Sequence, residues 1–279
     1  MELLGQYNGF WLLGLALSLL ATGLVAGILA GLLGVGGGIV IVPVLYHLFT
    51  LLQVDDAVRM HMAVGTSLAT IIPTSIMSAR AHYRKGAMDL TLLRSLGPAV
   101  LVGAVVGGFL GSLFGGDVLG FIFAAIALVV AANMAFRAEG TSLAKDLPGR
   151  IGRSAMGVGI GSISAVMGIG GGTLGVPVLS AFSFPIRRAV GTASALGLLI
   201  GVPGAAGFVL AGLGVAERPP GSLGYINLIG FLLIVPLTMR MAPVGANLAH
   251  RINPVWLRRA FAIFLAATAL RMFLDLFNG

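Results

Sequence analysis

Cysteine is absent from the 279 residues of this chain, and charged residues are scarce. Without cysteine the protein has no disulfide bond, no thiolate metal ligand and no cysteine nucleophile. Charged residues make up 9% of the sequence, whereas a soluble domain carries about a quarter. Such a chain lacks the polar surface that water requires, and its 58% hydrophobic content predicts a protein embedded in the lipid bilayer.

Catalytic and nucleic-acid-binding patterns are missing as well. The sequence has no His-Glu-x-x-His pair, no Gly-x-Ser-x-Gly phrase and no paired carboxylates inside an apolar run, so we expect no enzyme activity and no metal site. Gly170–Gly175 fits the dinucleotide pattern, but no strand of a soluble βαβ unit precedes it, and no cofactor is expected. The net charge of +8 is spread over short polar segments, which indicates membrane topology rather than nucleic-acid binding.

Ten apolar segments account for most of the chain. Several are as long as the roughly 20 residues that a helix needs to cross a bilayer. The first is too long for a cleaved signal peptide and lacks its flanks, so it is kept as a span. The sequence predicts an all-α polytopic membrane protein. Its helical segments are expected near 10–33, 37–52, 57–79, 92–114, 117–136, 154–168, 171–184, 186–213, 223–249 and 256–276.

One glycine-rich phrase occurs twice. Gly34–Leu45 (GVGGGIVIVPVL) and Gly168–Leu179 (GIGGGTLGVPVL) are identical at 8 of 12 positions, and Ala-Val-Gly-Thr follows each of them, at 63–66 and 189–192. Five segments fall in each half, and an odd number of crossings inverts the second half in the membrane. The sequence therefore predicts an inverted repeat of two five-helix halves. The expected parts are a first repeat at 1–136, a cytoplasmic linker at 137–153 and a second repeat at 154–279.

Basic residues gather on one side of this arrangement. With both termini outside, 13 of the 17 Lys and Arg residues fall on the inner side, and six of the nine acids face outward. Treating the two glycine-rich segments as re-entrant loops would place several basic loops outside. The positive-inside rule therefore favours ten crossings of a bacterial inner membrane, with both termini periplasmic.

The glycine-rich phrases are the predicted substrate site. The helix after the second phrase is only about 20 Å long, against a hydrocarbon core of about 30 Å, so the glycine turns should lie inside the membrane. Glycine exposes backbone N–H groups there, and helix N-termini bind anions. Candidate binding residues are Gly34, Gly36, Gly37, Gly38, Gly168, Gly170, Gly171, Gly172 and Thr173, and Pro43 and Pro177 should kink the helices that follow.

Each candidate also has a structural alternative. The glycines could serve only close helix packing, as expected for Gly27–Gly31 and Gly103–Gly111. Thr66 and Thr192 could donate to a substrate anion or bond to a carbonyl one helical turn back. Arg240 could clamp a substrate oxyanion from within the membrane, or the ninth segment could end just before it and leave it in an inward loop.

Several phrases together resemble the sulfite exporter TauE/SafE family. They are the two glycine-rich phrases, the two Ala-Val-Gly-Thr phrases, Ile72–Ser75, Arg80–Gly86, Pro243–Arg251 and Leu257–Phe261. The resemblance covers nearly the whole chain. It implies a bacterial inner-membrane transporter of sulfite, of sulfonates such as sulfoacetate, or of related sulfur compounds. Arg240 departs from the resemblance, because a small or apolar residue is expected there in the family.

The sequence favours export of a small sulfur-containing anion by alternating access between the two halves. No Asp or Glu lies in the middle of an apolar segment, so a common proton-coupling group is missing. Efflux of an anion from a negative interior is favoured by about 2.3 kcal/mol per charge at 100 mV. The alternatives are an anion channel and a non-transport intramembrane enzyme or assembly factor. The glycine faces of the helices would permit a homodimer.

Overall fold

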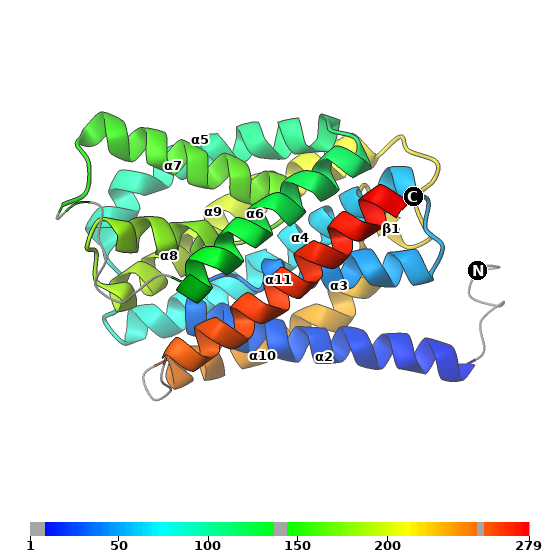
Figure 1. Ribbon diagram of the computed structural model, residues 1–279, viewed down its shortest axis with the longest axis horizontal. Coiled ribbons are helices and arrows are strands. Elements are labelled where there is room, and N and C mark those ends of the chain that lie inside the picture. The colour runs from blue at the N-terminus through cyan, green and yellow to red at the C-terminus, as the bar shows by residue number, and fades with distance from the viewer. Residues whose placement is uncertain (1–8, 137–143, 145, 250–253, 279) are drawn as a thin grey trace.

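Ten helices and one short hairpin make up the described part of the chain. The computed structural model describes residues 9–136, 144, 146–249 and 254–278 (Figure 1). Each of the ten predicted segments corresponds to one helix. The helices are α2 (Gly9–Leu33), α3 (Gly38–Leu51), α4 (Asp56–Arg84), α5 (Leu90–Leu113), α6 (Gly116–Phe136), α7 (Arg150–Met167), α8 (Gly171–Ala181), α9 (Ile186–Gly212), α10 (Leu228–Leu248) and α11 (Pro254–Asn278), and the antiparallel strands are β1 (Ser222–Leu223) and β2 (Ile226–Asn227).

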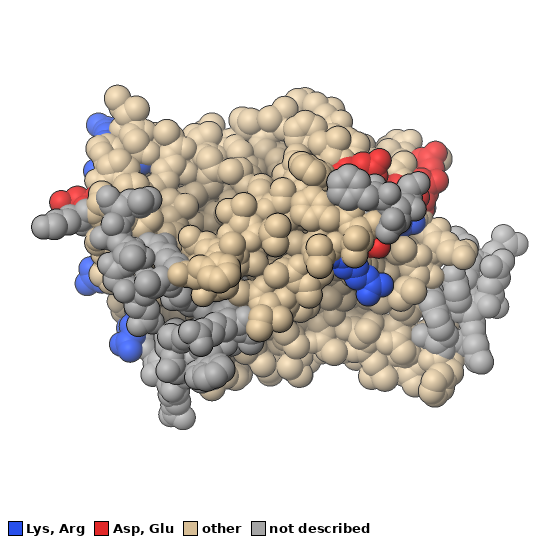
Figure 2. Space-filling view, in the orientation of Figure 1, with Lys and Arg blue, Asp and Glu red and all other residues tan. Residues whose placement is uncertain are grey.

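The prediction of an all-α polytopic membrane protein is confirmed. Among the described residues, six helices are both long and apolar enough to cross a bilayer, namely α2, α4, α5, α6, α9 and α10. Figure 2 shows a largely uncharged surface between the two ends of the molecule, with most of the visible Lys and Arg at one end and most of the visible Asp and Glu, with a smaller group of basic residues, toward the other. This distribution is the one that a bilayer-spanning bundle requires.

Small residues allow the helices to pack closely. α2 packs along α10, α5 along α7, α4 along α9 and α6 along α11. A Cβ atom added at Gly31 would overlap the carbonyl of Ala242, and one added at Gly107 would overlap the carbonyl of Ser162. The predicted packing role of Gly27–Gly31 and Gly103–Gly111 agrees with these contacts, because only glycine lets the two backbones approach so closely.

Helix α4 lies at the centre of the bundle. Within its apolar stretch of 18 residues, 72% is buried inside the protein, compared with 28–44% for the corresponding stretches of the other five long apolar helices. α4 packs against α3, α9 and α10. The two Ala-Val-Gly-Thr phrases lie on α4 and α9, and Thr66 and Thr192 have no exposed surface.

Two predicted boundaries were wrong. The ninth segment does not begin at 223, because the β1–β2 hairpin occupies that stretch, with Gly224 in a left-handed conformation (φ 54°) and Asn227 capping α10. The linker does not extend to 153, because α7 already begins at Arg150. Of the remaining linker, residues 137–143 and 145 lie outside the described residues.

Candidate functional site

The two glycine turns meet in the interior of the protein and cross in antiparallel directions. A Cβ atom added at Gly38 would overlap the carbonyl oxygen of Gly168, and one added at Gly172 would overlap the carbonyl group of Gly34. All residues of both turns are buried. The residues in close contact are Gly34 with Gly172, Gly36 with Gly170, and Gly38 with Gly168.

Positive φ angles make glycine necessary in both turns. Gly37 (φ 80°) is the N-cap of α3, and Gly168 (φ 69°) ends α7. At that end the N–H of Ile169 donates to the carbonyl of Ser164 at 2.9 Å, and the N–H of Gly168 donates to Ala165 at 3.3 Å. These two bonds form a Schellman motif, whose left-handed residue strongly favours glycine.

The turns leave two helix N-termini facing each other without a side-chain cap. α3 has 14 residues and α8 has 11, so at 1.5 Å per residue they are about 21 and 16 Å long. Both N-caps are glycines, Gly37 and Gly170, which have no side chain to bond to the first turn. Helices α7 and α9 also begin without a side-chain cap, whereas α4, α5 and α10 begin with capping side chains from Asp55, Asp89 and Asn227. In Figure 1, α3 and α8 extend toward opposite ends of the bundle. An uncapped N-terminus carries partial positive charge and free N–H donors, which suit an anion.

The predicted kink positions lie in the interior of these two short helices, at the sixth of the 14 residues of α3 and the seventh of the 11 residues of α8. Pro43 lies inside α3 and Pro177 inside α8, and both helices continue past their proline. Each proline removes one backbone donor from its helix.

The repeated threonines act as hydrogen-bond acceptors, which the sequence reasoning missed. The Thr66 hydroxyl accepts a bond from the backbone N–H of Asn227 at 2.8 Å. In the second half, the Thr192 hydroxyl accepts a bond from the N–H of Asp89 at 3.0 Å. Asn227 and Asp89 are the N-caps of α10 and α5. Each threonine therefore holds the start of a helix from the other half.

The glycine of each Ala-Val-Gly-Thr phrase explains why this contact can form. A Cβ atom added at Gly65 would lie 2.5 Å from the carbonyl oxygen of Tyr225, and one added at Gly191 would overlap the carbonyl of Ala87. Glycine at these places lets the extended segment before α10 or α5 lie directly on α4 or α9. The two phrases are thus matching docking points.

Further hydroxyl contacts tie α4 to its neighbours. Ser67 donates to the carbonyl of Gly168 at 2.7 Å, which links α4 to the second glycine turn. The Thr74 and Thr238 hydroxyls lie 2.7 Å apart and connect α4 to α10. A lone serine or threonine in an apolar segment carries no sequence signal for such a partner, because the partner is more than 100 residues away in the chain.

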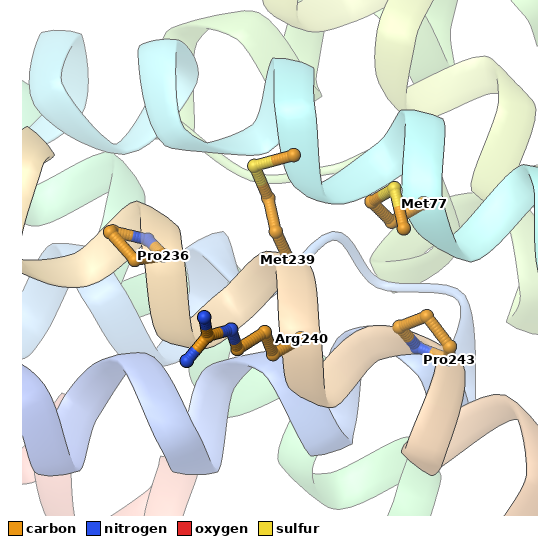
Figure 3. A pocket seen from close by; sticks show the side chains of 5 residues that line it. All are labelled: Met77, Pro236, Met239, Arg240 and Pro243. Atoms are coloured by element: carbon orange, nitrogen blue, oxygen red, sulfur yellow. The ribbon is translucent and has the colours of Figure 1, made fainter.

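Arg240 lies within α10, which continues to Leu248, so the helix does not end before the arginine. Its side chain is exposed, and Figure 3 shows it extending along α10 toward Pro236. No described contact joins Arg240 to the glycine turns. It borders a recess of about 420 Å³ whose other lining residues are Met77, Pro236, Met239 and Pro243.

Within the described residues, no group of three or more His, Asp or Glu side chains could hold a metal ion. The polar groups that the described residues bring to the glycine turns are backbone amides and hydroxyl groups. Such neutral donors can replace the hydration shell of an anion without forming a covalent bond to it.

Comparison with known proteins places this architecture among membrane transporters. The sequence profile of the family described as "Sulfite exporter TauE/SafE" matches residues 19–272. A "Probable membrane transporter protein" of Haemophilus influenzae is 33% identical over 255 residues, which cover 91% of this chain and 97% of the relative. A protein of the same description from Methanocaldococcus jannaschii is 28% identical over 265 residues, covering 92% of this chain and 94% of the relative. The similarly described YunE of Bacillus subtilis is 29% identical over 258 residues, covering 84% and 89%.

No solved structure gives a significant match to the chain. The family profile and the relatives each extend over most of its length, and the profile covers both glycine turns and both threonine docking points. This protein therefore belongs to the sulfite exporter TauE/SafE family of membrane transporters.

Proposed function

We propose that this protein exports sulfite or a related small organosulfur anion across a bacterial inner membrane by alternating access. The observation that carries the proposal is the meeting of two uncapped helix N-termini in the protein interior. Two such ends point partial positive charge at one place. Discontinuous helices that meet in this way form the substrate sites of many transporters with inverted repeats.

The moving parts would be two inverted repeats, one before the linker and one from α7 onward. Helix packing supports this division. If α2 to α6 correspond to α7 to α11, the contact of α5 with α7 is matched by that of α10 with α2, and the contact of α3 with α4 by that of α8 with α9. In the same way, the hydrogen bond from the Asn227 N–H to Thr66 is matched by the hydrogen bond from the Asp89 N–H to Thr192. Such matched contacts are expected when a two-fold axis relates the halves.

The proposed site has an interior part and an outlying part. The interior part is formed by the two glycine turns and Thr173, with Thr66 and Thr192 supporting it through the helices that they dock. Arg240 would be a separate anion contact on α10, because its charge is exposed 8 residues before the helix ends. A charge at such a place in a membrane helix is costly and usually functional.

The membrane potential supplies a driving force for this direction of transport. Basic residues are concentrated at the end of the bundle where α4 ends and where α5, α7 and α9 begin (Figures 1 and 2). By the positive-inside rule that end would face the cytoplasm and both termini would be periplasmic. For a monovalent anion, a 100 mV potential, negative inside, can sustain a concentration outside the cell that is roughly 50 times the concentration inside.

Sulfite flux in proteoliposomes with an imposed potential tests the proposal. The wild-type protein should give saturable flux that grows with the potential, and external sulfite should accelerate the exit of labelled internal sulfite. Gly37→Leu should abolish the flux, because a side chain at φ 80° is strained and its Cβ would lie 2.9 Å from the carbonyl oxygen of Ala26. Gly159→Leu is the matched control, since a Cβ atom there meets nothing within 4 Å.

The outcomes separate the alternatives. Linear, non-saturating flux without exchange would indicate a channel. Absence of flux for sulfite, thiosulfate and methanesulfonate in folded wild-type protein would contradict the proposal. Arg240→Ala should raise the sulfite concentration needed for half-maximal flux, and Arg240→Lys should restore it only in part, because lysine keeps the charge but loses the bidentate geometry.

A further inference from the structure

The two glycine turns are related in sequence, but their surroundings differ. We propose that the anion binds at only one of them, the N-terminus of α8, where the hydroxyls of Ser75 and Thr173 complete the site. This inference rests on the proposed transport function and deepens it. In this proposal Ser75 binds the substrate, and the N-terminus of α3 has a structural role and binds no anion.

Thr173 places an unpartnered donor in the first turn of α8. It is the third residue of the helix, its side chain is 2% exposed, and its hydroxyl has no hydrogen-bond partner among the described residues. A buried hydroxyl without a partner is uncommon in folded proteins, because its lost hydration is not replaced. Here the unpartnered hydroxyl lies beside a helix N-terminus that also lacks a side-chain cap.

Ser75 of α4 carries a second such hydroxyl, and a single glycine of α9 connects it to the start of α8. It is 1% exposed and also lacks a partner among the described residues. Its Oγ atom lies against Gly197 of α9, where an added Cβ would overlap it. Gly197 in turn lies against the first residue of α8, since a Cβ atom added at Gly171 would be 3.1 Å from the Gly197 nitrogen. Gly197 therefore lies against both the Ser75 hydroxyl and the start of α8, and it has no side chain of its own to fill the space there.

The N-terminus of α3 has no equivalent donors. In the repeat, Ile39 stands in place of Thr173, Gly201 in place of Ser75, and Ile71 in place of Gly197. The nearby hydroxyl, that of Ser67, already donates to the carbonyl of Gly168. A Cβ atom added at Gly38 would lie 2.8 Å from the Ile71 side chain and 2.9 Å from the Ser67 hydroxyl. The space at the N-terminus of α3 is therefore filled by aliphatic side chains and by Ser67, whose hydroxyl already has a hydrogen-bond partner.

An anion at the α8 end would satisfy both orphaned hydroxyls at once. The oxygens of the sulfite dianion and of sulfonates accept hydrogen bonds and donate none, so they fit two hydroxyls and the first backbone N–H groups of a helix. Both hydroxyl oxygens are shielded from solvent in this conformation. The site is therefore closed here, and an anion would reach it in a conformation in which the repeats have moved apart.

Ligand-dependent thermal stability of the full chain in detergent tests the assignment. The probe is sodium sulfite, compared with sodium chloride at equal ionic strength. Without sulfite, Ser75→Ala should unfold at or above the wild-type temperature, because it removes a buried unsatisfied group. Ser75→Ala and Thr173→Val should each weaken sulfite binding roughly tenfold or more and lose the sulfite-induced rise in unfolding temperature.

Two controls remove comparable hydroxyls elsewhere. Ser180→Ala deletes an unpartnered buried hydroxyl at the far end of α8, and Thr70→Val deletes one that donates to the carbonyl of Ser67 at 2.7 Å. Both should keep the sulfite-induced stabilisation. If Ser75→Ala does not fold, Ser75→Cys keeps the volume with a weaker donor and should also bind less tightly.

The results distinguish this inference from the transport proposal. Wild-type sulfite binding that survives unchanged in the Ser75 and Thr173 variants would overturn the α8 site and leave transport standing. Loss of binding in Ser180→Ala to the same extent would also overturn it, since the effect would not be specific to the N-terminus. A wild-type protein that responds to none of sulfite, thiosulfate and methanesulfonate overturns both proposals.

Discussion

Replacing Gly172 by alanine tests the closest contact between the two glycine turns. The added Cβ would overlap the carbonyl group of Gly34 and lie 2.7 Å from the nitrogen of Val35. All three atoms belong to the backbone, so no side chain can rotate away and the turns must separate. Overpacking of this kind costs about 1–3 kcal/mol.

Gly175→Ala is the matched control in the same helix. Its Cβ would lie 3.7 Å from Ala193 and 3.9 Å from Leu196, which is ordinary contact. Alanine in a helix is favoured over glycine by about 0.5–1 kcal/mol, so this variant should be slightly more stable than the wild type. The two alanine variants should therefore differ by roughly 1.5–4 kcal/mol.

The assay is thermal unfolding of the purified protein in detergent at one heating rate, followed by circular dichroism. For a chain of this size each kcal/mol shifts the midpoint by about 2–4 °C, so the two variants should differ by roughly 3–16 °C. The flux of Gly172→Ala should also fall, while that of Gly175→Ala is kept. Equal unfolding temperatures for the two variants would refute the close crossing of the glycine turns.

Three further changes probe the surrounding architecture by the same unfolding assay. Asp89→Ala should lower stability by about 1 kcal/mol because it removes the N-cap of α5, and Asp89→Asn, which can still cap, should behave like the wild type. Thr74→Val and Thr238→Val, combined in a double-mutant cycle, should show a coupling of about 0.6 kcal/mol; a coupling of zero would contradict their shared hydrogen bond. Gly159→Ala, on an open part of α7, should stabilise the protein by about 0.5–1 kcal/mol, and a loss of stability there would show an unrecognised contact.

Much of the fold could be predicted from the sequence because a bilayer restricts the solutions. A long apolar run must form a helix, since every backbone group in hydrocarbon needs a partner within its own segment. All ten predicted segments therefore have a helix, and the short α3 and α8 were expected from the glycine phrases. The helix ends were harder, because local turn chemistry decides them: the hairpin before α10 replaced a predicted stretch of helix.

The candidate site was predictable in location but not in detail. Repetition pointed to the glycine phrases and to Thr66 and Thr192. The acceptor role of those threonines was missed, because Asn227 and Asp89 are 161 and 103 residues away in the chain. Ser75 was noticed only as part of a family phrase. Its unpartnered hydroxyl becomes visible once α4 and α9 are packed together.

The sequence by itself determined that this chain is a helical membrane protein, that two of its phrases occur twice, and where its helices are interrupted. These properties follow from composition, period and the conformational preferences of glycine, all of which act locally along the chain. Only the tertiary structure decided that the two glycine turns cross, that the threonines dock the opposite half, and that Arg240 lies apart from the turns. Those outcomes depend on which helices pack together, and packing joins residues that no local pattern connects.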